Sequence, residues 1–192
     1  MQPLVTFILP SYQEESWNIA AINSLIAQKD PLWKAIVFNN GPNDLMRARV
    51  QLLQDSRFTY EESGTNTGSW GTFNRATAVK YLVDTPYCIQ SSIQDYWMGN
   101  AVEEINKQLL DEPDIITWPG LNHIFNYDRV EGLLEWSKID WGQACIKTDH
   151  YKRTGIVRPQ EFCADWFTFK EMMKQGLLKK RNRIEKTLTI HN

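Results

Sequence analysis

Cysteine is scarce in this sequence, and its few positions exclude two kinds of structure. Only Cys88, Cys145 and Cys163 occur among 192 residues, an odd number with no spacing that suits a zinc site or a disulfide framework. Cys88 and Cys145 lie inside apolar runs, where a free thiol packs as a small hydrophobic side chain. We therefore expect a soluble, cytoplasmic protein in a reducing compartment.

Long hydrophobic runs and an excess of one charge are also missing. The apolar run within residues 1–9 is too short for a secretory signal, and no stretch approaches the length of a membrane helix. With 21 basic against 23 acidic residues, the chain has no global basic footprint for nucleic acid. We interpret the basic run at 179–183 as the solvated end of a helix. We also expect no appended membrane anchor, which argues against a polymer-extruding synthase.

What the sequence does contain is a regular alternation of buried strands and helices. Apolar runs at 4–9, 34–39 and 87–90 predict buried strands, and the segments between them carry apolar residues at helical spacing. Further strands are expected at 57–61, 114–118, 121–125, 141–146 and 186–191, while 126–139 is interpreted as a mobile or inserted segment. This order predicts one α/β domain with a mostly parallel sheet flanked by helices.

Three of the predicted strands end in polar loops, at 11–14, 39–44 and 91–95. The carboxyl ends of parallel strands meet at one edge of a sheet, where ligands of such folds gather. Asp95 alone would suit a turn or a helix cap as well as a metal or sugar-nucleotide site. The coincidence of three loops favours a nucleotide site with a divalent cation at the third.

With these segments in place, the chain resembles the family 2 glycosyltransferases of the GT-A fold. The similar segments, in order, are Ile8-Leu9-Pro10-Ser11-Tyr12, Ser24-Leu25-Ile26-Ala27-Gln28, Asn39-Asn40-Gly41-Pro42-Asn43-Asp44, Asn66-Thr67-Gly68 with Asn74, Ser92-Ile93-Gln94-Asp95-Tyr96-Trp97, Ala164-Asp165-Trp166 and Thr189-Ile190-His191. The resemblance implies a single GT-A domain over 1–192, with a nucleotide-binding half at 1–97 and an acceptor-binding half at 98–192.

The resemblance also implies roles for individual residues. Asp165 matches the catalytic base, and Asp95 with His191 matches the metal ligands. The other implied contacts are with the nucleotide, through Pro10, Tyr12, Glu14, Asn40, Asn66 and Gln94, and with the sugar or acceptor, through Trp97 and Trp166. Because Asp165 is expected at the start of a helix, the helix dipole would favour its ionised form. Glu161 is an alternative base.

Departures from the family pattern modify these expectations. Asn40 replaces an Asp that would accept the imide proton of uracil, so its amide could instead donate to a different base. Ser92 and Gln94 replace two Asp of the metal segment, so we expect Mn²⁺ or Mg²⁺ to bind weakly or not at all. Phe73 stands where the family has Arg, and Arg75 or Lys147 could supply positive charge without a metal.

The expected reaction is transfer of a hexosyl or pentosyl group from a nucleoside diphosphate sugar to an acceptor hydroxyl, with inversion. The acceptor stays open between a glycan, a lipid, a protein, a small metabolite and a modified DNA base. An alternative is a catalytically silent module that binds a nucleotide, a sugar or a protein partner. A nucleotidyltransferase is disfavoured because no Gly-rich phosphate loop with basic residues follows the first strand.

Overall fold

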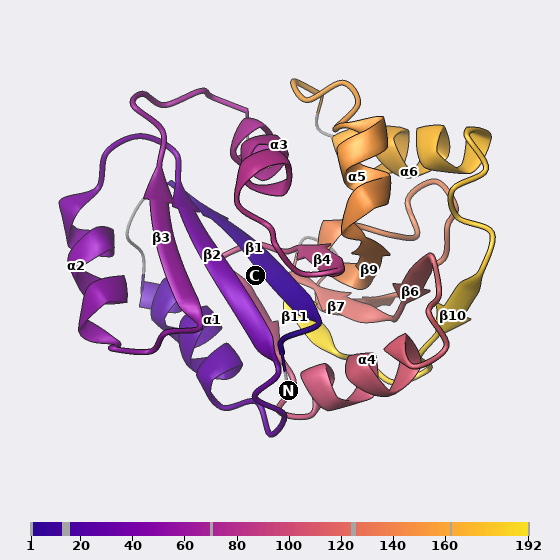
Figure 1. The fold of residues 1–192 in the computed structure, drawn as a ribbon, viewed down its shortest axis with the longest axis horizontal. Coiled ribbons are helices and arrows are strands. Elements are labelled where there is room, and N and C mark those ends of the chain that lie inside the picture. The colour runs from indigo at the N-terminus through magenta and orange to yellow at the C-terminus, as the bar shows by residue number, and fades with distance from the viewer. Residues whose placement is uncertain (1, 13–15, 70, 124–125, 162, 192) are drawn as a thin grey trace.

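A seven-stranded sheet forms the centre of the molecule in the computed structural model, which describes residues 2–12, 16–69, 71–123, 126–161 and 163–191. Its strands are β1 (Val5–Ser11), β2 (Trp33–Asn39), β3 (Phe58–Glu62), β4 (Tyr87–Gln90), β6 (Ile115–Thr117), β9 (Ala144–Lys147) and β10 (Arg181–Arg183). They lie in the order β10-β6-β9-β4-β1-β2-β3 (Figure 1). β1 is parallel to β2 and β4, whereas β9 is antiparallel to β4 and β6. The predicted mostly parallel α/β sheet is confirmed.

Helices pack on both faces of this sheet because neighbouring side chains of a strand point to opposite sides. They are α1 (Ser16–Ile26), α2 (Asp44–Leu52), α3 (Thr72–Tyr81), α4 (Ala101–Leu109), α5 (Thr148–Thr154) and α6 (Ala164–Lys174). Phe7 of β1 belongs to a buried cluster with side chains of α1, α2 and α4. Ile8 belongs to a second cluster with side chains of α3, α5 and α6.

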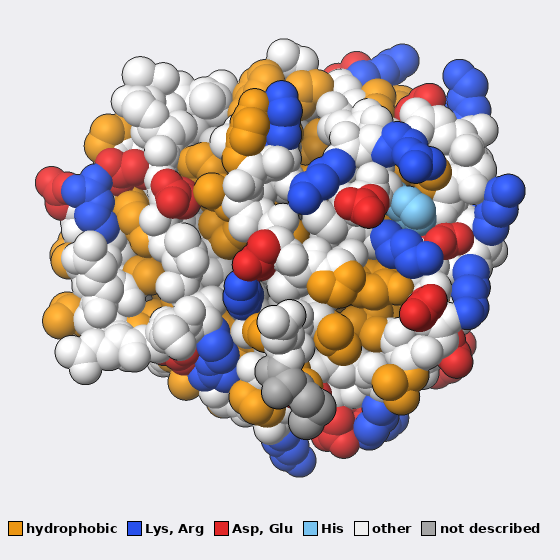
Figure 2. Space-filling model, viewed as in Figure 1, with side chains coloured by type: hydrophobic (Ala, Val, Ile, Leu, Met, Phe, Trp, Pro, Cys, Tyr) orange, Lys and Arg blue, Asp and Glu red, His pale blue; other side chains and the backbone are white. Residues whose placement is uncertain are grey.

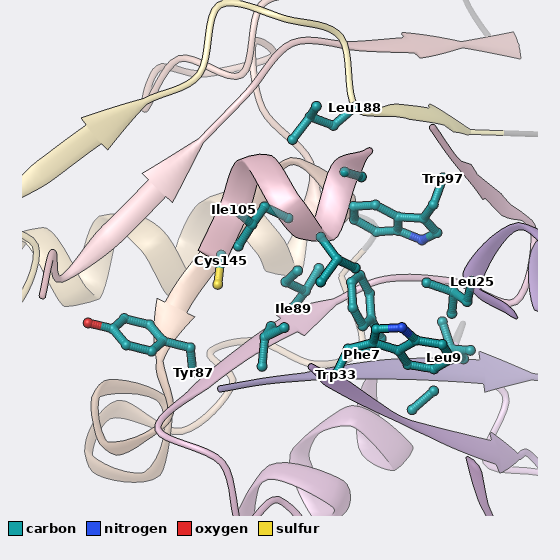
Figure 3. Close-up of a cluster of buried hydrophobic side chains, with 14 of the residues drawn as sticks. Phe7, Leu9, Leu25, Trp33, Tyr87, Ile89, Trp97, Ile105, Cys145 and Leu188 are labelled. Carbon is teal, nitrogen blue, oxygen red and sulfur yellow. The ribbon is translucent and has the colours of Figure 1, made fainter. Parts of the chain in front are cut away.

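Two tryptophans strengthen the first cluster, which Figure 3 shows in close-up. The Phe7 ring lies 4.7 Å from the ring of Trp97 and 6.3 Å from that of Trp33, both edge to face. Large buried rings supply much of the apolar area that stabilises such a core. Trp97 therefore belongs to the core of the fold.

A second, smaller sheet lies beside the first and brings distant parts of the chain together. It contains β5 (Asp95–Trp97), β7 (Gly120–Asn122), β8 (Asp128–Val130) and β11 (Thr189–His191), in the order β5-β11-β7-β8. β11 is antiparallel to β5, and His191 stands opposite Asp95 in that register. The strand pairing thus places a residue near the end of the sequence against one near its middle.

The second half of the chain differs from the sequence-based expectation at three places. Residues 128–130, interpreted as part of a mobile or inserted segment, form β8 and pair with β7. Residues 141–143 form a 3₁₀-helix, η2 (Trp141–Gln143), because the Asp140 side chain caps it. The basic run expected at a helix end contains edge strand β10, since its backbone pairs with β6.

The surface and the helix lengths bear on which partners the chain can meet. On the face shown in Figure 2, basic and acidic side chains are interspersed rather than gathered by sign. None of the helices in the described part of the chain has the length and apolar character needed to cross a bilayer.

Candidate functional site

The loops that follow β1, β2 and β4 meet at one edge of the main sheet, as the parallel strand order requires. Their backbones are joined directly. Asn40 N–H donates to the Ser11 carbonyl at 2.7 Å, and Ile93 N–H donates to the Pro10 carbonyl at 3.3 Å. The predicted convergence of the three loops is confirmed, and it gives this edge a fixed backbone frame.

A cavity of about 710 Å³ opens at this edge. Most of the residues singled out in the sequence line it, namely Pro10, Tyr12, Asn40, Gln94, Asp95, Asp165, Trp166 and His191, together with Glu161. Asn66 does not line the cavity; its Oδ1 accepts hydrogen bonds from Asn40 Nδ2 and from the Gly68 backbone N–H. Trp97 is 1 % exposed in the core and does not reach the cavity. Glu14 lies outside the described residues.

Asp95 is buried at the floor of the cavity and held by three donors. Its Oδ2 accepts from Ser91 Oγ at 2.6 Å and from the Ser92 backbone N–H at 2.8 Å. Its Oδ1 accepts from His191 Nδ1 at 2.5 Å. Burial opposes the charge on His191, but the hydrogen bond and charge of Asp95 and the nearby Asp140 raise the pKa of His191 to about 9. Asp95 and His191 therefore form an ion pair at neutral pH.

This arrangement does not fit a resident divalent cation. Mg²⁺ and Mn²⁺ prefer several oxygen ligands, of which more than one is usually anionic. Asp95 is the one carboxylate of the metal segment, and its oxygens already accept hydrogen bonds. Across the described ranges, no group of three His, Cys, Asp or Glu side chains is close enough to hold a metal.

Asp165 lies on another wall of the same cavity, in the first turn of α6. Burial raises its pKa to about 7, and the carboxylate of Asp140 adds to this, while the Trp166 N–H and Arg75 oppose it. The Trp166 N–H donates to Asp165 Oδ1 at 2.7 Å. The expectation that the helix start would leave this carboxyl readily ionised is thus wrong, because burial outweighs the helix dipole. A carboxylate that titrates near neutrality is suited to take up a proton.

Two further charged residues line the cavity between these acids. Arg75 of α3 is buried, and its Nη2 donates to the Ser91 carbonyl at 2.5 Å. Burial lowers the pKa of Arg75 to about 10, while Asp95 and Asp165 act against this, so it stays cationic at neutral pH. Burial also disfavours the charged form of Asp140, which raises the pKa of this carboxyl.

The sequence indicated Arg75 as a source of charge but did not single out Asp140, which follows no recognised motif. Lys147, the other cation considered, pairs with Asp114 at 3.0 Å and does not line the cavity.

The Asn40 side chain forms hydrogen bonds with the loop that follows β3. Its Oδ1 accepts from both the backbone N–H and the hydroxyl of Thr67, at 2.9 and 3.0 Å. Its Nδ2 donates to Asn66 Oδ1 at 2.8 Å. Because a backbone N–H can only donate, the contact with Thr67 fixes which end of the amide is oxygen. The oxygen that would accept a base imide proton is thus already used.

Comparison with known proteins identifies the relatives of this chain. Residues 6–174 match the model of the family described as glycosyl transferase family 2. A curated Escherichia coli protein, UDP-Glc:alpha-D-GlcNAc-diphosphoundecaprenol beta-1,3-glucosyltransferase WfgD, is 31% identical over 100 residues, which are 52% of this chain and 38% of that protein.

Solved structures share the fold at low sequence identity. Staphylococcus aureus TarS superposes over 100% of this chain and 37% of its own, with a TM-score of 0.81 and 15% identity. TarS 1–349 in complex with UDP-GlcNAc has a TM-score of 0.79 and 15% identity, over 99% of this chain and 58% of that one.

The Pyrobaculum calidifontis mannosyltransferase PcManGT, in complex with GDP-Man and Mn²⁺, has a TM-score of 0.73 and 13% identity. The match covers 100% of this chain and 57% of that one. The chain therefore has a GT-A fold, and it spans less than two thirds of the length of each of these proteins.

Proposed function

Because this chain belongs to the family 2 glycosyltransferases, we propose that it transfers a sugar from a nucleoside diphosphate sugar to an acceptor hydroxyl with inversion. The observation that carries the proposal is the shared cavity. A carboxylic acid that titrates near pH 7 faces the same space as the nucleotide-type loops of β1, β2 and β4. In this proposal residues 1–97 hold the nucleotide and residues 98–192 receive the acceptor.

The proposed step uses Asp165 as the base. The acceptor hydroxyl gives its proton to the Asp165 carboxylate while its oxygen forms a bond to the anomeric carbon. The bond from that carbon to the diphosphate breaks on the opposite side, which inverts the configuration and leaves the electron pair on the diphosphate. Positioned cations stabilise such developing charge. Arg75 and His191 are the cations of the described cavity lining that we assign to this task.

Two side chains that directly follow β1 and β2 bear on the identity of the donor base. Tyr12 is 53 % exposed beyond β1 and offers a ring face for stacking with a base. We assign Asn40 a donating role, since its oxygen is held by Thr67 and its amide nitrogen has a second hydrogen. This makes recognition of a uracil imide by Asn40 unfavourable. UDP-glucose, UDP-GlcNAc and GDP-mannose, which appear in the names of the relatives, are the first donors to compare.

The test combines binding and turnover. A thermal-shift series with UDP, CDP, GDP and ADP, followed by the corresponding sugar nucleotides, identifies the base, because a ligand that binds the folded state raises its melting temperature. With the best donor, Asp165→Asn is expected to lower transfer by roughly 10²–10⁴-fold without weakening donor binding. Asp128→Asn on exposed strand β8 is the matched control, and it should keep wild-type activity.

A catalytically silent binding module is the second candidate, and two observations favour it. The metal segment lacks its other carboxylates, and Asn40 is used within the protein. Donor binding with no transfer or hydrolysis under any condition, and no further loss in Asp165→Ala, would establish this alternative over the transferase.

A further inference from the structure

One exposed tryptophan at the rim of the cavity has no place in the reaction described so far. Trp136 lines the same cavity as Asp165 and is 55 % exposed. Removing a large aromatic side chain from water is favourable, so an exposed indole in the same cavity as a half-buried carboxylic acid indicates a surface that a ligand covers.

Two aromatic side chains pack against the Trp136 ring and fix its orientation. Trp166 packs against it at 6.1 Å between ring centres and 80° between planes, and Phe167 packs at 6.3 Å and 57°. Both neighbours belong to α6, the helix that carries Asp165 in its first turn. The helix that positions the base therefore also positions the indole.

The segment bearing Trp136 is held by its own backbone. Leu133 N–H donates to the Lys138 carbonyl at 3.0 Å, and Lys138 N–H donates to the Glu135 carbonyl at 3.2 Å. Just before this turn, Gly132 has φ +65° and packs so closely on Trp118 that a Cβ there would lie 2.0 Å from the Trp118 carbonyl oxygen. The ring is thus displayed on a pre-organised turn, which lowers the entropy cost of binding.

Charge around the ring distinguishes between possible ligands. Lys138 pairs with Glu135 at 2.6 Å, and Arg158 pairs with Glu161 at 3.3 Å. Val130 and Ile139 add apolar side chains to the lining of the same cavity. Because these cations are neutralised by their partners, the ring is better suited to a neutral group than to a phosphate.

From this geometry we infer that Trp136 is the stacking platform for a neutral pyranose ring of the acceptor, which places a sugar hydroxyl within reach of Asp165. The apolar face of a pyranose, built from axial C–H groups, packs well on an indole face. The inference rests on the proposed transferase function, and it names the acceptor class as a carbohydrate.

The experiment compares Trp136→Ala and Trp136→Tyr, with Tyr81→Ala as the control for loss of an exposed ring away from the cavity. Saturation-transfer NMR with methyl N-acetyl-α-D-glucosaminide measures acceptor contact, and glycerol serves as the ligand without a ring. Steady-state kinetics with the same glycoside separates KM from kcat. Donor hydrolysis without acceptor reports on the rest of the site.

Trp136→Ala should lose the saturation transfer and raise the acceptor KM about tenfold, while Tyr restores both to within about threefold. Donor hydrolysis should stay unchanged in every Trp136 variant. If Trp136→Ala keeps the acceptor KM while Asp165→Asn abolishes transfer, the platform is refuted and the transferase stands. If no donor is bound or cleaved, the proposed function fails, yet Trp136-dependent saturation transfer would still support the sugar subsite.

Discussion

Replacing Asp165 by Asn should make the protein more stable at alkaline pH as well as inactive. Burial and the neighbouring Asp140 raise the pKa of Asp165 from its ordinary 3.8 to about 7. Each unit of pKa corresponds to about 1.36 kcal/mol, so keeping this group ionised in the folded protein costs about 4 kcal/mol. That is a large fraction of the ~5–15 kcal/mol that holds a typical domain folded.

The sign of the pH dependence follows from proton binding. Between about pH 4 and 7 the folded protein keeps the Asp165 proton while the unfolded chain releases it, so the contribution of this group to stability falls as pH rises through that window. Asp165→Asn should match the wild type near pH 4. The free energy of unfolding of Asp165→Asn should then exceed that of the wild type by an amount that grows toward pH 7 and levels off at ~4 kcal/mol.

Urea unfolding at pH 5 and pH 8 measures this difference, with exposed Asp128→Asn as a control that should show none. The kcat/KM of the wild type should fall about tenfold for each pH unit below 7, since the base must be ionised. Asp140→Asn should move this acid limb to lower pH only modestly, because burial is the larger cause. An acid limb near pH 4, or equal stability gains at pH 5 and pH 8, would show that the pKa of Asp165 is not raised in the folded protein.

Three further outcomes can be checked. EDTA should change the transfer rate by less than about threefold, because the donor set does not fit a divalent cation; strict dependence on Mn²⁺ would contradict this. His191→Ala should cost ~1–3 kcal/mol in urea unfolding at pH 6 by leaving Asp95 without its cationic partner, although the donors from Ser91 and Ser92 remain. Since the pKa of His191 is raised to about 9, that cost should fade as pH rises from 6.5 to 9, and a pH-independent loss would count against the ion pair. Gly71→Ala should cost ~1–3 kcal/mol and weaken donor binding, because φ is +74° and a Cβ would lie 2.4 Å from Pro10 Cβ; unchanged melting would argue against that close contact.

The first half of the fold could be predicted well because its strands are continuous apolar runs with turn residues between them. Residues 5–11 and 87–90, for example, are buried along their whole length. The second half depends on tertiary contacts instead. β8 and β10 are three-residue strands without an apolar pattern, and each is defined by pairing with its neighbour.

The candidate site was predictable where it follows a strand end and not where packing decides. Asp95, Asp165 and His191 occupy motif positions, and all three line the cavity. Trp136 and Asp140 belong to no motif and come to the cavity through contacts with distant residues. The prediction that Asp165 would ionise readily had the wrong direction, because the sequence shows that the residue starts a helix but not that burial raises its pKa.

The pairing of β11 with β5 has a consequence for how the protein is made. The ribosome must add residue 191 before Asp95 receives its cationic partner, although all seven strands of the main sheet precede that residue in the chain. A chain that stops before residue 189 would lack β11 and, with it, the His191 side chain that lines the cavity.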